Sequence, residues 1–417
     1  MYEVIFLGQP PITQWFNRRV VQTRKTSLLP ELPDLMERSP DRHNSTTSRK
    51  VPMRRGSSMN ALPKLQQKRG SVVKTTPALR RASTRSSLSE GGSPLPAKCL
   101  DIAVGGETII VAELENSQQS RLKLYSVESG VRLLGTVARD SAMSCSGTHL
   151  SHSSTRGTTF CSLREKPYLV TSLTGVIVRQ LCAGIGYTVL CTNDGKVFSW
   201  GKGDHGCLGH GDTDSRQEPQ QVLSLPFTEI VHVSAAHSHT SMVSSDGEVY
   251  MCGSGSKGQL GTGSNSDSST PVALDVSDSA KMACCGGNES HPFTILLTAA
   301  GAVLSSGDAE NGKLGIGSKW SKKSFSYIGK NHFGNNRVDF ISAGVDHSLA
   351  LTSNSLVFQW GLITVPPSAE DRHGVIRTRV ENTPKQVEHP SLEDMVPQKI
   401  FAGHQYSVIC GRSRHRS

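Results

Sequence analysis

The chain has 417 residues and a net charge of +10, a length that suits one large repeat domain or two ordinary domains. The positive charge belongs to its beginning: residues 1–100 contain 18 Lys and Arg against 6 Asp and Glu, whereas the remaining residues contain 27 against 29. No apolar segment reaches the roughly 18–20 residues that span a membrane, and the mildly apolar start lacks the basic segment of a secretory signal peptide. The ten cysteines are scattered without a C-x-x-C pair, as in reduced proteins. We therefore expect a cytoplasmic or nuclear protein without membrane contact.

The first predicted region, residues 1–97, is a basic tail rich in Ser and Pro, which we expect to be disordered. Three sequences of two basic residues, a small residue and Ser lie within 30 residues of one another, and a looser fourth precedes them. Basophilic kinases bind such sequences, which makes their serines candidate phosphorylation sites: Ser57, Ser71, Ser83 and, from the looser sequence, Ser27. The alternative is a merely basic, Ser-rich linker. The same Lys and Arg side chains could contact nucleic acid or chromatin.

Residues 98–417 are rich in glycine and contain a repeated unit. Each clear copy begins with a strand of small residues that ends in a hydroxyl side chain. These hydroxyl anchors recur 52 to 59 residues apart, at Thr188, Thr240, Thr294, Ser348 and Ser407. A degenerate earlier copy has its anchor at Thr108. Because 80 residues separate Thr108 from Thr188, we expect an insertion in this copy at about residues 141–159, where Ser and Thr are frequent.

The later parts of each copy predict short antiparallel strands. An alternating run closes on a glycine in four copies, at Gly201, Gly253, Gly307 and Gly361. A G-x-L-G-x-G sequence follows in three copies, with central glycines Gly209, Gly261 and Gly315. Asp-Gly pairs at 194–195 and 246–247 lie between the strands and predict hairpins in which both turn residues have positive φ. Short strands with a period near 50 residues favour propeller blades over a helical solenoid.

These features resemble the regulator of chromosome condensation repeat family. Residues 341–351 fit the strand signature of that family throughout, and residues 233–243 fit it apart from Ala236. The resemblance implies an all-β fold, a β-propeller of four-stranded blades of about 52 residues, five to six of them recognisable here. Two departures are the missing G-x-L-G-x-G sequence in the fourth full copy and Ser306 at a position where Trp is common.

The length of the repeat region predicts difficulty in closing the ring. Propellers of this family usually have seven blades, which would need roughly 360 residues at this period, whereas about 310 are present. Only residues 2–7 of the tail could supply a missing strand. We therefore expect an incomplete or six-bladed ring, stabilised by a partner or by self-association through open blade edges, or a truncated product.

Several motifs have a simpler structural interpretation. Residues 201–206 and 253–258 match G-x-G-x-x-G, but the match recurs with the blades and no helix is predicted after it, so we expect no dinucleotide cofactor. His232, His237 and His239 invite a metal site. Two observations oppose it: the alternation of a strand separates His232 from the others, and His239 shares a repeat position with His347, where the family has a structural histidine. We also expect blade packing from Trp200 and Trp360, which share one repeat position.

The family resemblance leaves three classes of function open, and no catalytic motif supports an enzyme. We favour a protein-interaction scaffold or regulator with a phosphorylatable tail, whose partner is a protein such as a small GTPase or a kinase. Guanine-nucleotide exchange on a Ran-like small GTPase, together with chromatin association, is the second class. The third is a detached regulatory domain of a NIMA-related-type kinase, because some of these kinases carry such a propeller behind a basic linker.

Overall fold

The computed structural model shows seven antiparallel β-sheets in the described part of the chain. It describes residues 3–8, the strands between 99 and 169, and residues 170–414 apart from 227, 366–376 and 405. Side chains are described from residue 170 onward, apart from those gaps and their flanking residues 365 and 377. All the strands belong to one compact unit made of residues 1–24 and 92–417.

Six of the sheets have four strands each, hydrogen-bonded in sequence order. The first sheet contains β2 (Cys99–Gly105), β3 (Thr108–Leu114), β4 (Gln119–Ser126) and β5 (Gly130–Ala138). The second contains β6 (Ala142–Ser146), β7 (His149–Ser153), β8 (Thr159–Leu163) and β9 (Tyr168–Leu169). The third contains β10 (Val178–Ala183), β11 (Tyr187–Thr192), β12 (Val197–Gly201) and β13 (Arg216–Gln221).

The next three sheets repeat this arrangement. The fourth contains β14 (Ile230–Ala235), β15 (His239–Ser244), β16 (Val249–Gly253) and β17 (Ser268–Ala273). The fifth contains β18 (Ala280–Gly286), β19 (Phe293–Thr298), β20 (Val303–Gly307) and β21 (Lys322–Tyr327). The sixth contains β22 (Val338–Ala343), β23 (His347–Thr352), β24 (Val357–Val365) and β25 (Arg377–Gln386).

The remaining described elements are the seventh sheet and five short helices. The seventh sheet has the order β1 (Glu3–Gly8), β27 (Tyr406–Ser413), β26 (Met395–Ala402). The helices are η1 (Thr171–Leu173), η2 (Asp204–Gly206), η3 (Glu310–Gly312), η4 (Lys330–Phe333) and α2 (Pro390–Glu393).

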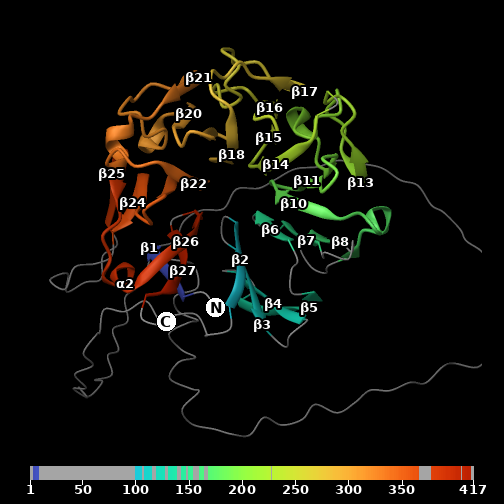
Figure 1. Ribbon diagram of the computed structural model, residues 1–417. Helices are drawn as coiled ribbons and strands as arrows, with labels where there is room; N and C mark the ends of the chain where they lie inside the picture. Colours follow the sequence, from blue (N-terminus) through green and yellow to red (C-terminus); the bar gives the residue numbers. More distant parts are fainter. Residues whose placement is uncertain are drawn as a thin grey trace, which may run out of the picture. The chain divides into compact units, whose positions relative to one another are not determined.

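The sheets form a closed ring, which is a β-propeller (Figure 1). The first strand of each sheet contacts the first strand of the next, from β2 through β6, β10, β14, β18 and β22 to β26, and β26 in turn contacts β2. The propeller expected from the sequence is therefore confirmed, but its sheets number seven rather than five or six. Each sheet is one blade.

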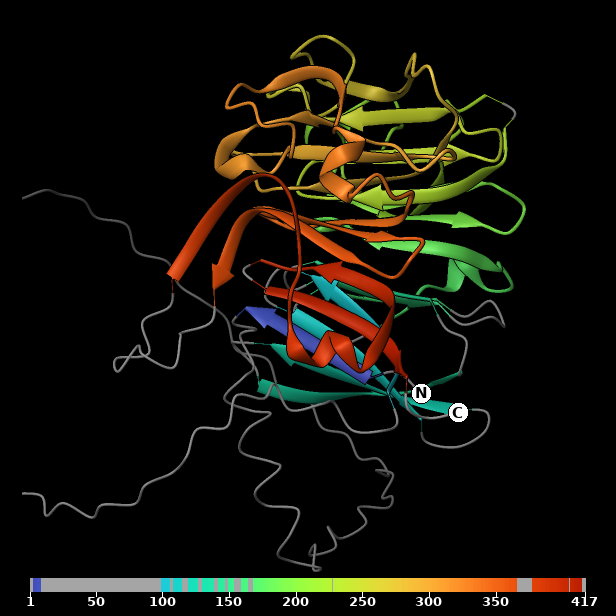
Figure 2. The same ribbon diagram turned by 60° about the vertical axis from the view of Figure 1, so that its left-hand side comes forward.

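Closure depends on the beginning of the chain. β1 pairs antiparallel with β27 along all six of its residues, with Ile5 opposite Ile409, and Figure 2 shows the blue strand β1 beside the red strands of the seventh sheet. Residues 3–8 therefore belong to the propeller, although we assigned them to the tail. The same pairing covers the edge of β27 and removes our reason for expecting self-association through an unclosed ring.

The expected insertion at about 141–159 is instead most of the second blade, strands β6 to β8. The first two blades fit between residues 99 and 169 because their strands are joined by connections of only two to five residues. They lack the long glycine-rich loop of the later blades. A sheet is defined by backbone pairing, which needs no particular side chains, so these two blades leave little trace in the sequence.

The later blades show why the repeated residues recur. Every residue of β11, β15, β19 and β23 is buried, because the second strand of a blade is covered on both faces by the neighbouring blades. One core cluster joins Phe293 and Ile295 of the fifth blade to Ile341 and Trp360 of the sixth. The hydrophobic core thus lies between blades rather than within them.

The predicted hairpins are present with one difference. β11 pairs with β12 and β15 with β16, each across a turn that contains the Asp-Gly pair. Gly195 and Gly247 have φ values of 76° and 85°, but Asp194 and Asp246 are not among the residues with positive φ. Only the glycine therefore needs the left-handed region. The four-residue connection allows the Asp to keep an ordinary conformation.

Candidate functional site

The hydroxyl anchors hold neighbouring blades together. Thr240 Oγ1 donates to the Cys207 carbonyl at 2.8 Å, and Thr294 Oγ1 donates to the Gln259 carbonyl at the same distance. Ser348 Oγ donates to the Lys313 carbonyl at 3.3 Å. Each acceptor is the residue before Leu in G-x-L-G-x-G of the preceding blade. The hydroxyl anchor of one blade and the G-x-L-G-x-G sequence of the preceding blade are therefore hydrogen-bonded to each other.

His239 and His347 reach from one blade to the anchor of the next. His239 Nε2 lies 3.1 Å from Thr294 Oγ1, and His347 Nε2 lies 2.9 Å from Ser407 Oγ. Burial lowers the pKa of each imidazole to about 4. Both rings are therefore neutral near pH 7 and act as hydrogen-bonding groups inside the ring. His237 lies in the turn before β15 rather than on a strand, so strand alternation does not apply to it.

The repeated glycines occupy positions that a side chain could not share. The four glycines that close the third strands have φ between 102° and 107°: Gly201, Gly253, Gly307 and Gly361. The central glycines of the loops also have positive φ, between 70° and 80°: Gly209, Gly261 and Gly315. A Cβ on Gly315 would lie 2.7 Å from Trp360 Nε1, which donates to the Lys313 carbonyl at 2.8 Å. Trp200 and Trp360 are 2% and 0% exposed.

The glycine-rich loops and the first hairpin turns of the blades lie at the same end of the strands, because Tyr187 and Gly201 are paired there, as are His239 and Gly253. We call this side of the propeller the loop face. It is defined by loops 202–215, 254–267 and 308–321 and by turns 184–186, 236–238, 287–292 and 344–346. The last glycine of each loop donates its N–H to the outer strand of the next blade, as Gly263 does to Lys323 O at 2.8 Å. The loops are thereby held against the blades.

A buried ammonium group lies beneath the loop face between the fifth and sixth blades. The side chain of Lys313 is 0% exposed, and its Nζ lies 3.6 Å from Asp308 Oδ1 and 3.7 Å from Asp346 Oδ1. The same Nζ donates to the His291 carbonyl at 3.0 Å and lies 5.7 Å from the centre of the Phe293 ring. Burial lowers the pKa of Lys313, while Asp308 and Asp346 oppose that shift.

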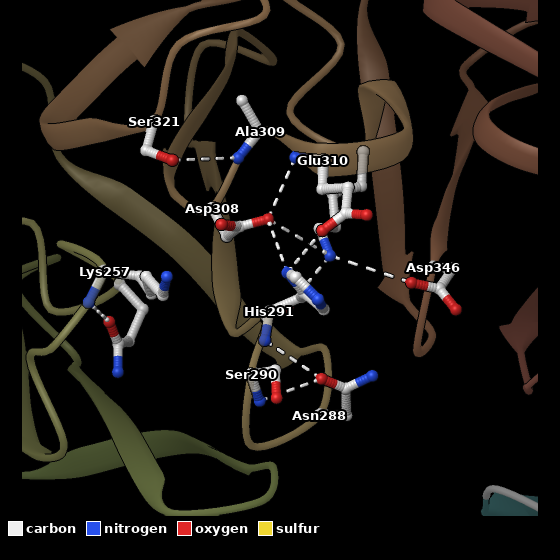
Figure 3. A network of polar contacts seen from close by, with 11 residues as sticks. Lys257, Asn288, Ser290, His291, Asp308, Ala309, Glu310, Ser321 and Asp346 are labelled. Carbon is white, nitrogen blue, oxygen red and sulfur yellow. Dashed lines mark hydrogen bonds and ion pairs between the residues drawn. The ribbon is translucent and has the colours of Figure 1, made fainter.

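His291 lies beside this group, and its side chain is partly exposed to solvent (Figure 3). Its Nδ1 lies 2.7 Å from Glu310 Oε2 and 3.3 Å from Asp308 Oδ1, where protonation of the ring makes both contacts ion pairs. Asn288 Oδ1 accepts hydrogen bonds from the backbone of Ser290 and His291 and fixes the turn that carries the ring. We call His291, Asp308, Glu310, Lys313 and Asp346 the polar cluster.

Three members of the polar cluster, Asp308, Lys313 and Asp346, differ together from their counterparts in the third and fourth blades. The third and fourth blades have Cys207 and Gln259 where the fifth has Lys313. In place of Asp308 they have Lys202 and Ser254, and the counterparts of Asp346 in the turns are Ser238 and Pro292. The Lys313 ammonium group therefore lies where two carboxylates, those of Asp308 and Asp346, face it. Its charge is compensated by residues that occur only at the junction of the fifth and sixth blades among these three junctions.

His291, Asp308 and Glu310 also form a group whose ligand atoms lie within 4.8 Å of one another, as a metal site would require. The Lys313 ammonium approaches the same Asp308 oxygen and would repel a second cation. We therefore assign the polar cluster an electrostatic and structural role. This cluster escaped the sequence reasoning because its residues come from two blades; the concerted change at aligned repeat positions was the available signal.

The serines proposed for phosphorylation lie outside the described residues: Ser27, Ser57, Ser71 and Ser83. So does most of the basic tail. Cys182 and Cys285 are free thiols, and burial raises the pKa of each to about 12. No helix in the part of the chain that the structure describes is long and apolar enough to cross a membrane.

Comparison with known proteins agrees with the repeat geometry. The Regulator of chromosome condensation (RCC1) repeat matches residues 194–243 and 246–290. Human E3 ubiquitin-protein ligase HERC2 is 33% identical over 199 residues, which are 47% of this chain and 4% of that protein. Protein RCC2 homolog of Xenopus laevis is 30% identical over 264 residues, covering 57% of this chain and 50% of the relative. The chain thus spans half or less of the length of these relatives.

The fold is also similar to a solved structure, that of Prp20p from Saccharomyces cerevisiae. The TM-score is 0.61 at 15% identity, and the similarity covers 77% of this chain and 84% of the other. That protein is described with its binding properties to Gsp1p and histones. The repeat match, the relatives and the shared architecture agree. The chain is a β-propeller that contains regulator of chromosome condensation (RCC1) repeats at residues 194–243 and 246–290.

Proposed function

We propose that this protein is a non-catalytic binding propeller, which recognises a protein partner through its loop face. One observation carries the proposal: the three glycine-rich loops share their inward hydrogen bonds but differ in their outward side chains. At the same exposed loop position the third, fourth and fifth blades carry Asp214, Ser266 and Trp320. A rigid framework with variable outward residues suits recognition, because binding residues concentrate on loops that a scaffold holds in place.

The basic tail is the regulated part in this proposal. Phosphorylation would add about −1.5 to −2 charges per serine at pH 7. Modification of three serines would offset roughly half or more of the positive charge of residues 51–98, a net of +9. Contacts of the tail with acidic surfaces or chromatin would weaken in consequence. We place this regulation in the cytosol or nucleus, at Ser57, Ser71 and Ser83.

Site-specific photocrosslinking in cells tests the loop face. A photoreactive residue is placed at exposed loop positions, Asp214 and Ser266, and at exposed turns at the other ends of the strands, Lys196 and Asp246. We expect a discrete crosslinked protein from the first pair and none from the second. Crosslinks from the second pair alone, or from neither pair, would contradict the proposed function.

A nucleotide-release assay separates binding from exchange. The full chain is added to a panel of purified small GTPases loaded with a fluorescent guanine nucleotide. We expect no acceleration of release beyond that of a buffer control. A stimulated release that depends on loop-face residues would place the protein among exchange factors and overturn the non-catalytic assignment.

A further inference from the structure

An exposed tryptophan stands at the end of the glycine-rich loop of the fifth blade. Trp320 is 81% exposed. Its backbone N–H donates to Ser318 Oγ at 3.1 Å, and the next residue, Ser321, accepts a hydrogen bond from Ala309 N at 3.3 Å. The indole is thus presented on a fixed turn, where its large apolar surface faces water. Aromatic side chains of this kind contribute much of the binding energy at protein interfaces.

The fold itself does not require an indole there. The corresponding residues in the loops of the third and fourth blades are Asp214 and Ser266, both exposed. All three loops make the same contact with the following blade: Gly211, Gly263 and Gly317 donate to the backbone of its outer strand at 2.8 to 2.9 Å. Because the same loop architecture accepts Asp, Ser and Trp, the fold of the loop gives no reason for the tryptophan.

Three lysines surround Trp320 in the sequence: Lys319, Lys322 and Lys323. None of them forms an ion pair among the residues that the structure describes, since the lysines in such pairs are Lys196 and Lys313. The aligned residues of the fourth blade are uncharged: Asn265, Ser268 and Ser269. In the third blade the residue aligned with Lys322 is Arg216, whose charge is paired with Asp212 at 2.7 Å. Unpaired positive charge at this place is therefore specific to the fifth blade among the three loops.

A groove with both polar and apolar lining adjoins the lysines. It lies between the outer strands β17 and β21 and has a volume of about 420 Å³. Its apolar lining comes from Val272, Leu274, Val276, Phe325 and the Tyr327 ring, and its polar lining includes Thr262, Asp275 and Ser277. Val272 and Tyr327 are 37% and 51% exposed. Lys322 and Lys323 directly precede Ser324 and Phe325 of the groove lining in β21. At most about 11 Å of extended chain separates Lys323 from Trp320.

We propose that Trp320, the three lysines and this groove bind an extended segment of a partner protein, in which acidic residues flank an apolar side chain. The apolar side chain would enter the groove, and the acidic residues would pair with the lysines. This inference rests on the proposed function and names the chemistry of the partner. The basic tail has the same sign of charge as the lysines and is not the occupant.

The charges nearby favour a protein segment over nucleic acid. The same loop carries Asp308 and Glu310, and Asp346 lies in the neighbouring turn. These carboxylates limit the positive surface to the three lysines, which suits a short acidic segment better than a phosphate backbone that continues past them. Nucleic-acid sites commonly make about 6–10 phosphate contacts, more than three lysines supply. A short acidic segment needs only a local positive patch.

Selection from a random peptide library identifies the preferred segment. The immobilised full chain is presented with 15-residue peptides displayed on their encoding mRNA, and enriched peptides are labelled and titrated by fluorescence anisotropy. We expect enrichment of sequences that combine Asp or Glu with a large apolar residue. Trp320→Ser and Trp320→Asp should each weaken binding at least tenfold, and both introduce the residue of a sister loop.

A charge-matched pair of variants tests the lysines. Lys319→Asn/Lys322→Ser/Lys323→Ser should weaken binding at least fivefold and make the remaining affinity less sensitive to salt. The control Lys196→Ser/Lys330→Ser/Lys385→Ser removes the same charge from exposed positions outside the loop face and should change affinity less than twofold. Unchanged thermal unfolding of each variant shows that the fold is retained.

Three results would overturn the inference. Enriched peptides could lack acidic residues, or they could bind the tryptophan variants as tightly as the unmodified chain. A 20-nucleotide single-stranded DNA probe could also bind more tightly than any peptide in a manner that requires Trp320, which would assign the site to nucleic acid. None of these results alters the crosslinking outcome at Asp214 and Ser266, so failure here is distinguishable from failure of the proposed function.

Discussion

Replacing Lys313 by Gln, the residue that the fourth blade has at this position, removes the buried ammonium group and leaves Asp308 and Asp346 facing each other. Loss of one partner from a buried ion pair costs about 3–5 kcal/mol. The two carboxylates keep side-chain exposures of 10% and 16%, so water can relieve part of that cost. We therefore expect Lys313→Gln to lower the free energy of unfolding by about 2–3 kcal/mol.

The companion variants decide whether the charges are responsible. Lys313→Gln/Asp308→Ser/Asp346→Ser installs uncharged residues found at the equivalent positions of other blades and should regain most of the lost stability, since no carboxylate remains unpaired. Lys257→Gln, an exposed lysine of the sister loop, should change stability by less than about 0.5 kcal/mol. Urea unfolding followed by intrinsic fluorescence measures all three. A triple variant as unstable as Lys313→Gln, or a neutral Lys313→Gln, would refute the reasoning.

Three further predictions concern the ring and the tail. The pKa of about 4 for His239 and His347 lies below the ordinary 6.5, so the unfolded chain binds more protons between these values and stability falls as pH falls. Urea unfolding at pH 7.5 and pH 5 should differ by about 2 kcal/mol per histidine, and equal stabilities would contradict this. Deleting residues 1–8 should lower the melting temperature and cause aggregation by exposing the edge of β27, whereas deleting residues 25–91 should do neither, as light scattering can show. Treatment with a basophilic kinase should modify the tail serines and reduce the salt dependence of DNA binding; mass spectrometry that finds none of them modified would reject the proposal, which names Ser57, Ser71 and Ser83.

The repeated blades could be predicted because their residues are constrained locally. A third strand that closes on glycine at φ above 100°, as at Gly201, excludes any other side chain without strain, so the glycine marks each copy. Thr240 and Thr294 recur for a similar reason. Each buried hydroxyl donates a hydrogen bond to a backbone carbonyl in the glycine-rich loop of the preceding blade, and buried polar groups need such partners. Such positions leave a regular signal in one sequence.

The polar cluster and the exposed Trp320 could be recognised only with the blades in register. His291, Asp308 and Lys313 come from one blade and Asp346 from the next, and nothing in their spacing shows that they meet. Trp320 resembles any other tryptophan until its 81% exposure and its alignment with Asp214 and Ser266 are known. The residues that we propose for binding are those that vary between the repeats, so they can be recognised only by comparing aligned positions of the blades.

The sequence by itself determined the propeller architecture, the period of the later blades and the division between a basic tail and a nearly neutral repeat region, because turn glycines and buried hydroxyls are dictated by local backbone geometry. Only the tertiary structure decided the number of blades and the closure of the ring. β1 joins β27 across nearly the whole length of the chain, and backbone hydrogen bonds formed the first two blades without the repeated side chains. Pairing between distant strands depends on which edges meet in space, and that is a property of the assembled ring.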